Sequence, residues 1–128
     1  MIERTELAPG LEIPRVVTGL WQVADMERGG TKLDPARAVA AMAEYVAEGF
    51  DAFDMADHYG SAEEITGHLL ASGARARAFT KWCPEPGPMT PEAVRAGVDR
   101  ARQRMRSERI DLWVNNLFYF PSLLLFGS

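Results

Sequence analysis

Short apolar segments typical of buried strands alternate with longer helix-like segments along most of this chain. The strand-like segments are residues 15–20, 50–54, 76–82 and 110–114. The helix-like segments are residues 34–48, 61–73 and 90–105. A strand, a helix and a second strand in succession predict parallel strands joined by right-handed crossovers. The sequence therefore indicates an α/β fold, in which residues 2–7 and 11–14 form a β-hairpin ahead of four parallel strands.

The predicted helices begin at recognisable capping signals. Asp34 and Thr90 each precede a proline, and a short polar residue followed by proline is typical of a first helical turn. Ser61 and Glu64 have the spacing of a capping box, in which each side chain accepts a main-chain N–H at the start of the helix. Gly49 follows the first helical segment and can adopt the left-handed conformation that ends a helix.

Composition narrows the class of protein. The chain has 128 residues, enough for the core of one domain, and its 14 basic and 18 acidic residues give a net charge of −4. This negative balance repels a phosphate backbone, so we expect no nucleic-acid partner. Cys83 is the single cysteine, which excludes an internal disulfide, and no His or Cys spacing predicts a metal site. The start of the chain lacks a signal-peptide pattern and no segment reaches roughly 18 apolar residues, so we expect a cytoplasmic protein without a membrane span.

The third helical segment and the residues after it are rich in arginine. The arginines are Arg95, Arg100, Arg102, Arg104, Arg106 and Arg109. They could form a basic patch, but Glu92, Asp99 and Glu108 interleave with them and the arginines spread round the helix. A solvated helix face is therefore favoured over a nucleic-acid surface.

Three residues near strand ends form a candidate catalytic group. Asp54 ends the second parallel strand, Lys81 lies at the end of the third, and Tyr59 follows Asp54 by five residues. The carboxyl ends of parallel strands are where α/β folds place active sites, and a carboxylate there needs a cation such as Lys81. An ammonium beside a phenol stabilises the phenolate, which would make Tyr59 a proton donor. The alternative is a structural ion pair with Tyr59 packed at the rim.

A longer stretch carries a family resemblance. Residues 49–67 read GFDAFDMADHYGSAEEITG, which resembles the signature of the aldo-keto reductase family. The segments FTK at residues 79–81, VTGLW at 17–21 and RIDL at 109–112 resemble other family segments in the same order. The similarity runs from about residue 2 to residue 113.

This resemblance implies a (β/α)8 TIM barrel, of which the chain holds the N-terminal half, and transfer of a hydride from NADPH to a small-molecule carbonyl. By motif position, Asp54, Tyr59 and Lys81 match three of the family's four catalytic residues. The fourth is a histidine, and this chain has Asn116 at that position. Asparagine can donate a hydrogen bond but cannot donate a proton as an acid.

The resemblance also implies where ligands bind. Gly19, Leu20 and Trp21 match the strand end on the nicotinamide side of the cofactor. We expect Trp21, His58 and Trp82 to line a substrate pocket, with ordinary packing at the rim as the alternative for the two tryptophans. Because family members hold the pyrophosphate and adenosine mainly with loops of the other half of the barrel, we expect impaired activity.

The last residues differ in composition from the rest. Residues 114–128 contain no Asp, Glu, Lys or Arg, so we assign residues 1–113 to a partial barrel and 114–128 to an apolar tail outside the family pattern, as in a truncated product. The tail could instead cover an open sheet face, or, less favoured, lie on a membrane surface.

Half a barrel would leave the sheet face that lines the interior without partners. That face would include Val17, one residue of each neighbouring pair Ala52/Phe53 and Ala78/Phe79, and Leu112 or Trp113. The alternative to an enzyme is therefore a non-catalytic isoform or interaction module that self-associates through its open edges.

Overall fold

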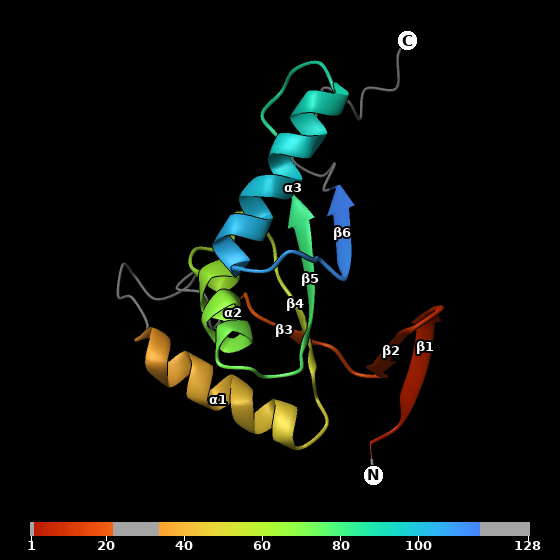
Figure 1. Cartoon of the computed structure of the whole chain (residues 1–128), viewed down its shortest axis with the longest axis vertical. Coiled ribbons are helices and arrows are strands. Elements are labelled where there is room, and N and C mark those ends of the chain that lie inside the picture. The colour runs from red at the N-terminus through yellow and green to blue at the C-terminus, as the bar shows by residue number, and fades with distance from the viewer. Residues whose placement is uncertain (1, 22–33, 116–128) are drawn as a thin grey trace.

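A computed structural model of the chain describes residues 2–21 and 34–115. Two antiparallel strands, β1 (Arg4–Ala8) and β2 (Leu11–Pro14), form a hairpin. A separate four-stranded parallel sheet has the order β3-β4-β5-β6. Its strands are β3 (Thr18–Gly19), β4 (Ala52–Asp54), β5 (Arg77–Trp82) and β6 (Leu112–Asn115), and the helices are α1 (Pro35–Ala47), α2 (Ala62–Ala71) and α3 (Pro91–Met105). The predicted α/β class, with a hairpin before four parallel strands, is confirmed (Figure 1).

The first parallel strand is shorter than predicted. β3 contains only Thr18 and Gly19, which lie opposite Phe53 and Asp54 of β4. The residues before it do not join the parallel sheet, and the N–H of Arg15 donates to the Glu3 carbonyl at 3.0 Å instead. Arg15, which was predicted to begin the first parallel strand, therefore extends the hairpin instead.

Two of the three predicted helix caps are present. The Asp34 carboxylate accepts the N–H of Ala36 at 3.1 Å, and the Thr90 hydroxyl accepts the N–H of Ala93 at 3.1 Å. The predicted capping box at Ser61 is wrong, because the Ser61 side chain makes no capping hydrogen bond to α2. Its backbone has φ −91° and ψ 11°, outside the extended conformation in which a serine side chain reaches back to the first helical turn.

The three helices pack on one face of the sheet (Figure 1). Residues of all three helices, together with Phe53 of β4 and Ala78 of β5, form one buried apolar cluster. Phe53 is fully buried at its centre. Helices that cross over between parallel strands run antiparallel to them, so the amino end of α3 lies at the carboxyl ends of the strands.

The opposite face, called the inner face below, is covered at one end only. Ala52 and Phe79 point to this face and are buried in a second cluster with Ile13 of the hairpin. The expectation that this face lacks partners is therefore wrong at Ala52 and Phe79, and also at Val17, which is partly buried against the same cluster. It holds for Leu112 of β6, which is 38% exposed, and Val114 on the same face is 41% exposed.

Other predictions fall partly or wholly outside the described residues. Asn116 and most of the predicted tail belong to residues 116–128, which the structure does not describe. In the described ranges, no helix is long and apolar enough to cross a membrane. The same ranges contain no group of three His, Cys, Asp or Glu side chains arranged to hold a metal ion.

Candidate active site

Asp54 and Lys81 form an ion pair at the carboxyl ends of neighbouring strands. Asp54 lies opposite Phe79, two residues before Lys81, and alternate residues of a strand share a face, so all three side chains point to the inner face. The Lys81 ammonium donates to Asp54 Oδ2 at 2.6 Å and to the Met55 carbonyl at 3.0 Å. The predicted pair is thus present. With the Asp54 side chain 40% exposed, such a pair contributes about 0–1 kcal/mol to stability.

Tyr59 lies beside this pair, in the loop between β4 and α2. Its ring centroid is 5.4 Å from Lys81 Nζ. The Trp21 ring meets the Tyr59 ring edge-on at a centroid distance of 4.9 Å, and the His58 ring does so at 5.0 Å. The structure therefore brings together five of the predicted site residues: Asp54, Lys81, Tyr59, Trp21 and His58.

The end of β3 contributes an open surface next to these residues. Gly19 is exposed, and a Cβ placed on it would meet no atom of the described residues within 4 Å. Leu20 differs, because its side chain is buried in the helix-side cluster and its N–H donates to the Asp54 carbonyl at 2.9 Å. Of these two residues, Gly19 alone leaves room on the inner face. The buried side chain of Leu20 cannot contact a ligand there, so only its main chain could.

Trp82 does not join the site. It follows Lys81 in β5 and so points to the opposite, helix-covered face. Its ring stacks on Trp113 at a centroid distance of 5.1 Å, and a Cβ on Gly97 of α3 would lie 2.8 Å from it. The predicted place of Trp82 in a substrate pocket is therefore wrong, and the packing alternative holds.

Two carboxylates that form hydrogen bonds between different elements were not predicted from the sequence. Asp57 accepts the N–H of Cys83 at 2.9 Å. Glu63 is buried in α2, where it accepts the Thr80 hydroxyl at 2.6 Å and pairs with Arg104 of α3. Glu63 shares the buried face of α2 with Thr66 three residues later, and this spacing was an available signal for a buried acid.

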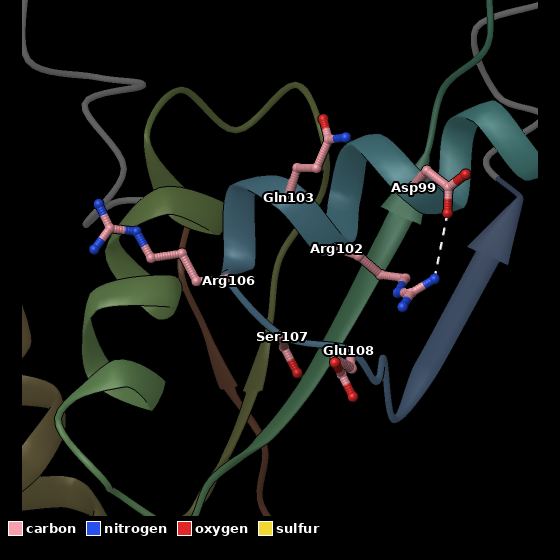
Figure 2. Close-up of a pocket in the computed structure, with 6 residues that line it drawn as sticks. All are labelled: Asp99, Arg102, Gln103, Arg106, Ser107 and Glu108. Carbon is pink, nitrogen blue, oxygen red and sulfur yellow. Dashed lines mark hydrogen bonds and ion pairs between the residues drawn. The ribbon is translucent and has the colours of Figure 1, made fainter.

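A separate hollow of about 360 Å³ lies at the carboxyl end of α3. It is lined by Asp99, Arg102, Gln103, Arg106, Ser107 and Glu108 (Figure 2). Arg102 pairs with Asp99 at 3.3 Å, and Figure 2 shows Gln103 and Arg106 pointing away from that pair. Since α3 runs antiparallel to the strands, this hollow lies at the rim opposite Lys81. Its mixed charges agree with the solvated face predicted for the arginines.

Comparison with known families decides the assignment. The model of the aldo/keto reductase family matches residues 15–119. The chain belongs to the aldo-keto reductase family. No curated protein matches the chain.

Solved structures agree in fold. A protein described as an aldo-keto reductase from Pseudomonas aeruginosa has a TM-score of 0.72 and 22% identity, over 88% of this chain and 46% of its own. The aldo-keto reductase of Klebsiella pneumoniae, solved with NADPH, gives 0.69 and 17%, over 88% and 38%. The apo form of a Bacillus halodurans member gives 0.64 and 20%, over 95% and 40%. The chain thus spans less than half of these relatives, and its sheet and hairpin match the N-terminal half of their barrels.

Proposed function

We propose that this chain carries the proton-donating part of an NADPH-dependent carbonyl reductase site. The observation that carries the proposal is the Asp54–Lys81 pair at 2.6 Å with the Tyr59 ring beside its ammonium. Because such an exposed pair contributes little to stability, the stability of the fold does not explain why Asp54 and Lys81 lie together. The Klebsiella pneumoniae relative, solved with NADPH, supports the choice of cofactor.

Each residue has a distinct role in the proposed reaction. The Tyr59 hydroxyl donates its proton to the carbonyl oxygen as that oxygen gains negative charge, which yields the alcohol. Lys81 stabilises the phenolate that remains on Tyr59, and Asp54 holds the ammonium in place. NADPH, when bound, supplies the hydride. Trp21 and His58 would form apolar and polar walls for the small-molecule carbonyl.

The described residues fit one end of the cofactor. The open surface at Gly19 leaves room beside the Asp54–Lys81 pair, and the exposed Trp21 ring adjoins it. A flat ring such as nicotinamide packs well on such a surface. We propose that this chain by itself binds NADPH weakly and reduces carbonyls slowly, because the loops that hold the rest of the cofactor in the family lie in the half not matched here. We also propose a cytoplasmic location, on the ground of the single, free Cys83.

Activity measurements with a chemically conservative variant test this proposal. NADPH oxidation by the purified chain with simple aldehydes should proceed far below the ordinary enzyme range of about 1–1,000 s⁻¹. The Tyr59→Phe variant, which loses only the hydroxyl, should abolish the residual rate. A rate in the ordinary range, or one that Tyr59→Phe leaves unchanged, would contradict the proposal.

A second candidate function is association through the inner face. Leu112 and Val114 are exposed there on β6, which pairs with β5 on one side only among the described strands. Exposed apolar side chains beside an open strand edge favour self-association. Sedimentation at micromolar concentration should show dimers or larger species that dissociate in the Leu112→Ser, Val114→Ser double variant. A monomer at all concentrations would rule this function out.

A further inference from the structure

Asp57 connects the Tyr59 loop to the end of β5 by both main chain and side chain. Its N–H donates to the Lys81 carbonyl at 2.9 Å, and its Oδ2 accepts the N–H of Cys83 at 2.9 Å. Its Oδ1 lies 3.1 Å from Nδ1 of His58. The largely buried Asp57 carboxylate thus contacts both Cys83, which follows β5, and His58, which precedes Tyr59.

The contact with Asp57 determines which ring nitrogen of His58 faces the carboxylate. An ionised carboxylate only accepts hydrogen bonds, so Nδ1 of His58 must carry the proton. The imidazole held in this way meets the Tyr59 ring edge-on at 5.0 Å, and Trp21 meets the same ring at 4.9 Å. Asp57 therefore orients the His58 ring, one of the two rings that contact Tyr59.

The main chain alone does not determine where the Tyr59 ring lies. Bonds between the loop and β5 run from Met55 to Phe79 and from Asp57 to Lys81, and the N–H of Tyr59 then bonds within the loop, to the Ala56 carbonyl at 3.1 Å. The Tyr59 carbonyl accepts the N–H of Ala62 at 2.9 Å, and the residue packs against the helix-side cluster, but its ring also contacts the rings of Trp21 and His58.

We propose that Asp57 is a positioning residue that holds the Tyr59 ring against the Lys81 ammonium through His58 and Cys83. The proposal rests on the proposed function in so far as Tyr59 and Lys81 carry the reaction. Its geometric content, that the position of Tyr59 depends on Asp57, can be tested without turnover.

Cys83 provides a built-in reporter of the Asp57 charge. Burial raises the pKa of the Cys83 thiol above its ordinary value, and the carboxylates of Asp57 and Glu85 raise it further. Removing either charge should increase the thiolate fraction and speed alkylation of the thiol several-fold. Glu85 is exposed and makes no hydrogen bond or ion pair within the described part of the chain, so Glu85→Gln is a matched control that changes the charge near Cys83 without touching Tyr59.

The test compares Asp57→Ala, Asp57→Asn and Glu85→Gln by NMR and thiol alkylation. In Asp57→Ala, the nuclear Overhauser contacts between the Tyr59 and His58 rings should disappear while Cys83 reacts several-fold faster. In Glu85→Gln, Cys83 should also react faster but the ring contacts should remain. Asp57→Asn preserves the shape of the side chain, which guards against a variant that fails to fold. Its amide oxygen can accept the N–H of Cys83, and its amide N–H can donate to His58. The nitrogen shifts of His58 should then report a proton on Nε2, with His68 unchanged as an internal reference.

Unchanged Tyr59–His58 contacts in Asp57→Ala, or an unchanged Nδ1-protonated His58 in Asp57→Asn, would overturn the proposal. Failure of the proposed function gives a different result. In that case Tyr59→Phe would leave carbonyl reduction unchanged, although Asp57→Ala would still displace the ring.

Discussion

The two faces of the parallel sheet use the same strands for different purposes. On the helix-covered face, Phe53 is fully buried and packs against residues of all three helices. On the inner face, the neighbouring residue Asp54 pairs with Lys81, and Leu112 is left exposed. Because successive side chains of a strand point to opposite faces, Phe53 packs under the helices while the next residue, Asp54, points to the inner face. The helix face therefore stabilises this half barrel, and the inner face is the one on which we propose the reactive groups.

Two phenylalanines on opposite faces give the sharpest test of this difference. Phe53→Ala should lower the free energy of unfolding by about 4 kcal/mol, because it opens a cavity between the sheet and the helices. Phe79→Ala should cost about 3 kcal/mol, at the lower end of the range for such a truncation, because Phe79 belongs to a smaller buried cluster. Urea unfolding of both variants measures the two costs. Equal costs would show that the faces do not differ in packing.

A buried charge tests the helix face in another way. Glu63→Ala leaves the buried Thr80 hydroxyl without its acceptor and the partly exposed Arg104 without its carboxylate, and it should cost about 1–3 kcal/mol. The neighbouring Glu64 is exposed, and Glu64→Ala should change stability by less than about 0.5 kcal/mol. A cost for Glu63→Ala no larger than for Glu64→Ala would contradict a structural role for the buried pair.

The sequence predicted those features that follow from local periodicity and from the ends of parallel strands. Alternating periodicity located the helices and strands, and the position of Asp54 and Lys81 at strand ends predicted their pairing. Strand alternation also explains the errors, because a Lys81 side chain on the inner face places Trp82 on the other face. Asp57 and Glu63 were missed because neither lies at a predicted strand end: Asp57 is in a loop and accepts a main-chain N–H, that of Cys83, and Glu63 is in a helix and pairs with Arg104 of another helix.

The turn between α3 and β6 should give the smallest effect. Arg106 ends α3 with φ 50° and ψ 38°, a left-handed conformation that costs a residue with a side chain about 1 kcal/mol. Arg106→Gly should therefore raise the free energy of unfolding by about 0.5–1 kcal/mol. Gly73 also has a positive φ, of 90°, in open space, and Gly73→Ala should destabilise by a similar amount. Thermal unfolding measures both, and a destabilising Arg106→Gly would contradict the strain argument.

We propose that the inner face offers a site for the nicotinamide end of NADPH beside Tyr59 and little for the rest of the cofactor. Saturation-transfer NMR tests it directly, because NADPH carries nicotinamide and adenine protons on one molecule and each serves as a control for the other. With the cofactor near 1 mM, where weak binding of about −4 kcal/mol is detectable, the nicotinamide protons should receive the larger share of saturation from the protein. Trp21→Ala should reduce that share. Equal transfer to both ends, or stronger transfer to adenine, would contradict the account.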